Sequence, residues 1–181
     1  MGNRQLIKLA IAAFILTGAM LLVGAFEDRQ EVTLKEGSYL LAGFNPEKVH
    51  GIYIQREWES LVLKRKDEGF VIAGKQESPV ANDHINRIVN AVARIRCDEK
   101  VTRDPRNHEA LDVAGGRSSL VIRFFTESGK KMTGVIIGRD RPGSVGFYAR
   151  LEDEKQVYRS TSSYPPVSMN VADYIRKNQP K

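Results

Sequence analysis

The sequence predicts an α+β fold in which a mainly antiparallel sheet has one long amphipathic helix packed on it and an N-terminal transmembrane helix before it. Three observations lead to this fold class. Several short runs alternate between apolar and polar residues, the apolar spacing becomes helical between Ala81 and Cys97, and residues 9–26 carry no charge. The chain has 181 residues, of which 41% are hydrophobic, so it can bury the core of one domain.

The first element is the apolar run LAIAAFILTGAMLLVGAF, residues 9–26. Its 18 uncharged residues would cross about 27 Å as a helix, which is near the minimum for a membrane span. Arg4 and Lys8 precede the run and acidic residues follow it, so we expect the chain to start in the cytoplasm and the rest to be exported. The alternative is a signal peptide that is cleaved after Ala25.

These signals also predict the order of segments along the chain and its place in the cell. We expect a single-pass protein of the bacterial inner membrane whose C-terminal domain lies in the periplasm or outside the cell. The expected segments are a cytoplasmic N-terminus (1–8), the anchor or signal peptide (9–26), a linker (27–45) and the extracytoplasmic domain (46–181).

Alternating residues predict two groups of strands, one before and one after the long helix. In the first group, His50–Arg56, Ser60–Lys66 and Gly69–Ala73 would form a meander with one apolar face. In the second group, turn residues separate four strands that we expect to pair as hairpins. These are Ser118–Thr126 with Met132–Ile137, and Gly146–Leu151 with Gln156–Arg159.

The predicted long helix covers Ala81–Cys97. Its apolar residues recur at the spacing of one helix face, and polar residues occupy the opposite face, so we expect the helix to lie across the sheet. The residues of the apolar face are Ile85, Ile88, Val89, Val92 and Ile95. Pro165 and Pro166 interrupt the chain before a short last helix, which is expected over Ser168–Lys177.

The segment Val135–Ser160 contains three glycines and raises the question of a phosphate-binding loop. Gly138 and Gly143 have the spacing of such a loop, but Ser144 follows where the motif requires lysine. The next residues have the pattern of a strand, so no helix N-terminus is expected there to bind an anion. We therefore expect a loop that joins two strands, with proline and glycine forming its turn.

The sequence predicts no catalytic, metal-binding or cofactor-binding residues. His50, His84 and His108 lie far apart, without the spacing of a metal site. Neither a nucleophile motif nor a Cys–His pair accompanies them. Cys97 is the only cysteine, so no intramolecular disulfide can form, and we expect a small core residue rather than a reactive thiol.

The basic charge of the chain is modest and scattered. There are 28 Lys and Arg against 22 Asp and Glu, a net charge of +6. Neither stacking aromatics nor a recognition-helix pattern accompanies the basic residues, so we expect no nucleic-acid partner. A solvated basic surface, which could face anionic lipid head groups, is the simpler interpretation.

Five residues are candidates for contact with a partner or an anion. Trp58 stands at the tip of the predicted first hairpin, where it is either an exposed contact residue or an aromatic that packs at an edge. Four arginines lie near the second hairpin system and could bind a negatively charged ligand. They are Arg139, Arg141, Arg150 and Arg159.

Several short motifs together resemble the bacterial domain-of-unknown-function family 4340. The matching positions are Leu111-Asp112, Gly129, Ile137-Gly138, Tyr148-Ala149-Arg150 and Val157-Tyr158, and the likeness covers His50–Ser163. Glu109-Ala110 and Phe70 depart from the family pattern, where Tyr-Gly and Trp are usual. The resemblance implies a membrane-anchored, extracytoplasmic α+β domain without known catalytic residues, associated with auxiliary parts of ABC-type transport or gliding systems.

These features lead us to expect a non-enzymatic, membrane-anchored interaction module outside the cytoplasm. Its partner would be a protein of the cell envelope, and the module would be an auxiliary component of an envelope transport complex. The alternative is a binding domain for an anionic lipid or an envelope polymer. A second alternative is an unrecognised hydrolase, which would have to show a deep pocket with converging titratable groups.

Overall fold

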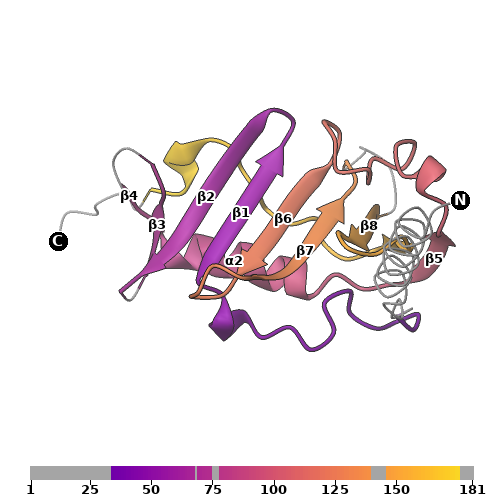
Figure 1. Ribbon diagram of the computed structural model, residues 1–181, viewed down its shortest axis with the longest axis horizontal. Coiled ribbons are helices and arrows are strands. Elements are labelled where there is room, and N and C mark those ends of the chain that lie inside the picture. Colours follow the sequence, from indigo (N-terminus) through magenta and orange to yellow (C-terminus); the bar gives the residue numbers. More distant parts are fainter. Residues whose placement is uncertain (1–33, 68, 75–77, 140–145, 176–181) are drawn as a thin grey trace, which may run out of the picture. The chain divides into compact units, whose positions relative to one another are not determined.

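The centre of the structure, within the residues described, is an antiparallel sheet of nine strands in the order β4-β3-β2-β1-β6-β7-β8-β9-β5 (Figure 1). The structure is a computed structural model, and it describes residues 34–67, 69–74, 78–139 and 146–175. The strands are β1 (Gly51–Arg56), β2 (Glu59–Lys66), β3 (Gly69–Ile72), β4 (Ser78–Pro79), β5 (Glu99–Thr102), β6 (Leu120–Phe125), β7 (Lys131–Ile137), β8 (Phe147–Leu151) and β9 (Val157–Ser160). The helices are α2 (Asn82–Ala93) and the short 3-10 helices η1 (Pro46–Lys48), η2 (Pro105–Asn107) and η3 (Val171–Asp173).

Alternation along the strands gives the sheet two different faces. On β1, Ile52 and Ile54 are buried in the main core, and Tyr53 between them lies on the opposite face. The register with β6 places Ile54 beside Ile122, so the buried rows continue from strand to strand. A shift by one residue would move each buried row to the other face, which is why this pattern fixes the register.

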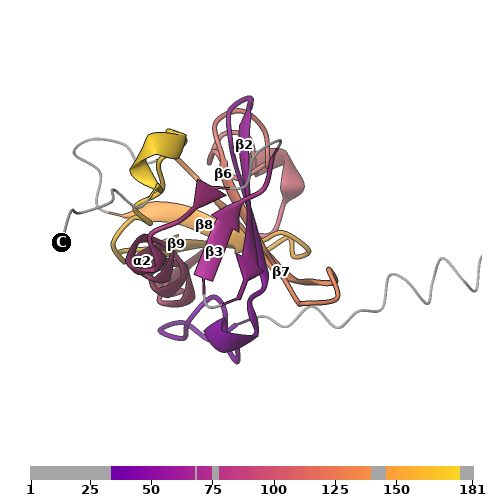
Figure 2. The same ribbon diagram turned by 90° about the vertical axis from the view of Figure 1, so that its left-hand side faces the viewer.

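Helix α2 covers one face of the sheet. Its apolar residues Ile85, Ile88, Val89 and Val92 are buried in the main core together with residues of the strands. Figure 2 looks along the sheet and shows α2 on one side of it. Four of the five residues predicted for the apolar face thus attach the helix to the sheet, whereas Ile95 lies beyond its end.

The helix is shorter than predicted, so the predicted fold class is wrong in its long helix. It has 12 residues and ends at Ala93. Beyond it, Leu40 N–H donates to the carbonyl of Ile95 at 2.7 Å, and Gly37 N–H donates to the carbonyl of Cys97 at 2.7 Å. Ile95 keeps the apolar spacing of the helix, but it lies beyond the end of α2, where its carbonyl pairs with the preceding chain.

The predicted fold class also included a transmembrane helix, and the structure does not support it. In the part of the chain that the structure describes, no helix is both long and apolar enough to cross a membrane. The segment for which the span was predicted, 9–26, lies outside the described residues.

The chain joins the domain before residue 46, although 27–45 was expected to be a linker. Leu40 is 1% exposed and belongs to the main core, and the Phe44 ring lies 4.9 Å from that of Phe124. The predicted last helix is reduced to η3, and Tyr174 after it is fully buried. In both segments, burying apolar side chains against the core stabilises the fold, so the chain packs there instead of staying in solvent.

A second, smaller core lies on the other face of the sheet. Val113 comes from the segment between β5 and β6, and it packs with Val121, Ile136 and Val157. This segment covers the face over β6 to β9. Over β1 and β2 the same face is more accessible, because Val62 on β2 is 36% exposed.

The connection between β7 and β8 joins neighbouring antiparallel strands, as predicted for this glycine-containing segment. Its centre, 140–145, lies outside the described residues. Gly146 has φ +85°, and a Cβ there would collide with the carbonyl oxygen of Ser160 on β9. The glycine therefore allows β8 and β9 to approach closely at their first contact.

Candidate functional site

Three arginines meet at one end of the sheet because of its strand register. Arg56, the last residue of β1, pairs with Leu120, the first residue of β6. Leu120 in turn pairs with Ile137, the last residue of β7. The residues just before β6 and just after β7 therefore lie near the end of β1, and these include Arg117 and Arg139.

A groove of about 450 Å³ lies at this end of the sheet. We call it the arginine groove, and its lining includes Arg56, Glu57, Arg117, Arg139, Tyr164 and residues 165–167. The lining thus combines three cations and one carboxylate with an aromatic ring and two prolines. Its volume is within the range of pockets that bind small ligands or short segments of a partner.

Arg56 is held in the groove by Tyr164. Its Nη2 donates to the Tyr164 hydroxyl at 3.4 Å, and its guanidinium carbon lies 5.8 Å from the centroid of the Tyr164 ring. Phe147 packs edge-to-face against the same ring, at a centroid distance of 5.3 Å. The tyrosine is therefore supported from β8, and it limits the orientations that the Arg56 guanidinium can adopt.

Trp58 lies beside the groove at the tip of the β1–β2 hairpin. Glu57 has φ 56°, which allows the chain to turn within two residues. The Arg117 guanidinium carbon lies 4.5 Å from the centroid of the Trp58 ring. A cation–π contact at such an exposed position contributes about 0.5–1 kcal/mol, enough to orient both side chains.

Among the residues that the structure describes, no carboxylate pairs with the arginines of the groove. In the described part of the chain, Arg56, Arg117 and Arg139 form no ion pair with a carboxylate, whereas Arg96, Arg106, Arg123 and Arg159 each do. Glu57 is the carboxylate that lines the groove. The groove therefore carries an excess of two positive charges among its described lining residues.

A family model described as "Domain of unknown function (DUF4340)" matches residues 71–179, more than half of the chain. The chain belongs to this family. The predicted resemblance is thus confirmed, although the match begins later and ends later than His50–Ser163. No curated protein and no solved structure matches the chain significantly.

The match to the DUF4340 family includes only part of the arginine groove. Arg117, Arg139 and Tyr164 lie within the matched residues, but Arg56 and Trp58 precede them. The β1–β2 hairpin thus adds a cation and an exposed tryptophan to the part of the groove that the family match covers.

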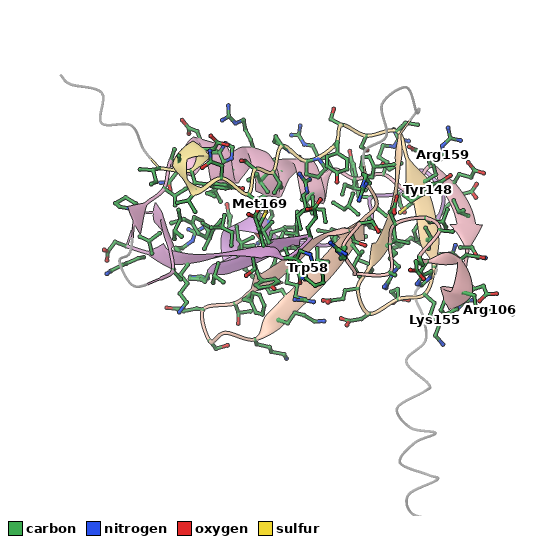
Figure 3. The ribbon with its side chains drawn as sticks, turned by 90° about the horizontal axis from the view of Figure 1, so that it is seen from above. Trp58, Arg106, Tyr148, Lys155, Arg159 and Met169 are labelled. Carbon is green, nitrogen blue, oxygen red and sulfur yellow. The ribbon has the colours of Figure 1, made fainter. Side chains whose placement is uncertain are left out.

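The structure brings two of the five predicted contact residues of this DUF4340 chain to one place. Trp58 and Arg139 lie at the arginine groove. Arg159 lies on β9, where its Nη1 is 3.3 Å from a carboxylate oxygen of Glu99, and Figure 3 shows it far from Trp58. Arg141 lies outside the described residues.

Arg150 has a different environment from the other predicted contact residues. It is 8% exposed, and its Nε donates to the carbonyl of Val113 at 2.7 Å. Its Nη1 donates to the carbonyls of Leu151, Glu152 and Glu154. The guanidinium therefore binds the turn between β8 and β9 rather than projecting into solvent.

Sequence reasoning missed Arg56, Arg117 and Tyr164. They are separated by 61 and 47 positions in the sequence, and no local pattern relates them. The signal that could have found them is indirect. An antiparallel pairing of β1 with the predicted strand 118–126 places the end of β1, at Arg56, beside the start of that strand, next to Arg117.

The three histidines lie on separate parts of the DUF4340 domain. His108 is buried, and its Nε2 lies 2.9 Å from the carbonyl oxygen of Lys155. His84 packs edge-to-face on Tyr174, and burial, followed by the charge of Arg87, lowers its pKa. Among the described residues, no three His, Cys, Asp or Glu side chains are grouped so that they could hold a metal ion.

Proposed function

We propose that this chain is a non-enzymatic interaction module that binds a partner protein through Trp58 and the arginine groove. One observation carries the proposal: Trp58 is 77% exposed, yet it is held in place by Arg117 beside a groove lined by arginines. Trp and Arg are the residues that most often dominate binding energy at protein interfaces. Covering an exposed indole with a partner would contribute roughly 2–3 kcal/mol.

The kind of charge in the groove supports a binding role. Three of its charged side chains are guanidinium groups, which have five N–H donors and no acceptor. Such groups attract and orient an anion, but they are poor at the proton transfers on which hydrolases rely. A fixed positive charge beside an exposed aromatic ring therefore suits recognition.

The proposed place of action is the cell envelope, outside the cytoplasm. The uncharged segment 9–26 follows Arg4 and Lys8, an order that supports export of the chain that follows. The partner would then be an envelope protein, such as a component of a transport complex. Protease added to cells with a permeabilised outer membrane should cleave the domain, and full protection would contradict this location.

Site-specific cross-linking tests the proposed interaction. The variant Trp58→p-benzoylphenylalanine should give a discrete adduct with one envelope protein when cells are irradiated. The matched control is Tyr39→p-benzoylphenylalanine, because Tyr39 is also an aromatic residue and 52% exposed. The absence of an adduct from position 58, or the same adduct from both positions, would overturn the proposal.

The second candidate function is binding of an anionic lipid or an envelope polymer. The arginines of the groove, which have no carboxylate partner among the described residues, favour it. In that case Arg139→Glu should abolish binding to vesicles that contain phosphatidylglycerol, and added salt should weaken the binding of the unmodified chain. Unchanged binding would remove this candidate.

A further inference from the structure

The arginine groove differs from a second charged cluster, around Glu152, in whether carboxylates of the protein pair with its cations. On β6 and β7, Arg123 and Lys131 share the carboxylate of Glu152, and Lys131 also binds Asp153. The protein thus neutralises these cations with its own carboxylates. At the groove, Arg56, Arg117 and Arg139 have no such partner in the described part of the chain. Among the described residues, nothing supplies their counter-charge, so a ligand can supply it.

Two of these arginines are oriented before any ligand arrives. Arg117 lies over the Trp58 ring and Arg56 over the Tyr164 ring. A guanidinium has five N–H donors, so a contact with an aromatic ring leaves others for further hydrogen bonds. These donors match a group with two oxygens in one plane, which accepts a pair of parallel hydrogen bonds. A carboxylate is such a group.

The rest of the lining favours a peptide over a membrane surface. Tyr164, Pro165 and Pro166 line the groove together with the cations, and Trp58 adds an exposed indole beside them. Apolar rings next to arginines suit a chain in which acidic and apolar side chains follow one another. Binding to anionic lipids instead uses clusters of about four to eight basic residues. Here three arginines line the groove, fewer than in such a cluster.

We infer that the arginine groove binds the carboxylates of an extended acidic segment of the partner, with Arg117 and Arg56 as the orienting cations and Trp58 covering an adjacent apolar side chain. The inference rests on the proposed function, because it specifies which part of the partner the module recognises. The acidic side chains of the partner would pair with the groove arginines, as Glu152 and Asp153 pair with Arg123 and Lys131.

A direct binding measurement tests this inference with the full chain. The probe is a short fluorescent peptide of alternating Glu and Leu, blocked at both ends, and the control probe has Gln in place of each Glu. We expect the Glu peptide to bind and the Gln peptide not to bind. Arg117→Gln combined with Arg139→Gln should weaken binding of the Glu peptide by at least about tenfold. Equal binding of the two peptides would overturn the inference.

Two further variants separate charge and geometry from damage to the fold. Arg117→Lys keeps the charge but removes the paired donors, so it should recover only part of the affinity that Arg117→Gln loses. Arg94→Gln removes an exposed arginine at the end of α2, outside the groove, and should bind like the unmodified chain. If Arg94→Gln weakened binding as much as Arg117→Gln, the peptide would be attracted by general charge, and the inference would fail.

Other anions and the cross-linking result complete the test. Inorganic phosphate or phosphatidylglycerol vesicles that bind through the same arginines more tightly than the Glu peptide would overturn the assignment to a peptide. If the Trp58 adduct forms but the arginine variants bind the Glu peptide normally, the proposed function stands and this inference fails. If the adduct is absent while the arginines control peptide binding, the carboxylate site stands and the proposed function fails.

Discussion

At the scale of single residues, Arg150 shows how one buried cation can stabilise a turn. Its guanidinium donates to four backbone carbonyls, one in the segment before β6, one at the end of β8 and two in the turn between β8 and β9. Carbonyl groups that are buried without a donor cost about 1–3 kcal/mol each. The arginine therefore ties two segments together and supplies donors to these four acceptors.

Replacing Arg150 tests this role. Arg150→Met keeps an apolar stem but removes the donors, and it should lower the free energy of unfolding by about 3 kcal/mol. Arg159→Met is the matched control, because the ion pair between Arg159 and Glu99 is exposed, and it should cost no more than about 1 kcal/mol. Urea denaturation measures both. Equal losses for the two variants would contradict the structural role of Arg150.

Cys97 provides a second residue-scale prediction. Its side chain is fully buried, and burial, followed by the charge of Asp98, raises the pKa of the thiol to about 12. The thiolate is the reactive form, so the native protein should not react with a thiol reagent at pH 8. Labelling should appear only as the protein unfolds in denaturant. Rapid labelling of the native protein would show that Cys97 is accessible.

At the scale of elements, the Glu152 carboxylate joins three strands. Arg123 on β6 places its Nε 2.7 Å from Glu152 Oε1, and Lys131 on β7 lies 3.3 Å from Glu152 Oε2. Glu152 itself follows β8, so the cluster fixes the positions of β6, β7 and β8 relative to one another. Hydrogen bonding to Arg123 is the largest of the effects that lower the pKa of Glu152.

This lowered pKa predicts how stability depends on pH. A carboxyl group whose pKa is lower in the folded state stabilises the fold above its unfolded pKa, and this contribution is lost as the pH falls through the folded pKa. Glu152→Gln should therefore cost about 1–2 kcal/mol near pH 7 and much less in acid. Denaturation at several pH values measures the difference. A loss that is the same at neutral and acid pH would rule out this linkage.

At the scale of the whole molecule, the domain includes residues that the sequence suggested were a linker. The described residues belong to one compact unit, Thr33–Lys181. Leu40 and Leu41 are buried in its core, and Phe44 packs on Phe124. Residues that precede β1 in the sequence therefore complete the core. A domain that begins at residue 46 would leave part of this core exposed.

Truncation and substitution test this boundary. Leu40→Ala should lower the free energy of unfolding by about 2–5 kcal/mol, because it leaves a cavity in the core. Glu36→Ala in the same segment should change it by no more than about 0.5 kcal/mol. A chain that starts at residue 46 should lose cooperative unfolding, whereas one that starts at residue 33 should keep it. Calorimetry distinguishes these outcomes, and a stable chain from residue 46 would contradict the boundary.

Sequence patterns predicted the parts of this molecule that depend on neighbouring residues. The hairpins of β1–β2 and β6–β7 have alternating strands and turn residues, so local signals were sufficient. Strand β5 was missed, because its four residues are mostly exposed and it is a strand only through pairing with β9. The end of α2 was misplaced for a similar reason, since pairing with residues 37–40 interrupts a spacing that still looks helical.

The candidate site was only half predictable for the same physical reason. Trp58 could be placed at a hairpin tip from its neighbours, and Arg139 followed a strand that the sequence marks clearly. Arg56 and Arg117 meet only because β1 pairs with β6, a contact between distant parts of the chain. Conversely, Arg150 looked like the other arginines, and only the path of the chain around it shows that it is buried.

The pairing of β5 with β9 has a consequence for synthesis of the chain. Glu99 on β5 pairs with Arg159 on β9, so a growing chain can form the β1–β2–β3 meander early, but the β5 edge has no partner until β9 emerges from the ribosome. Tyr164 and residues 165–167, which complete the arginine groove, emerge later still. The arginine groove is therefore complete only after the sheet is finished. Under the proposed function, incompletely synthesised chains would lack the site that binds the partner.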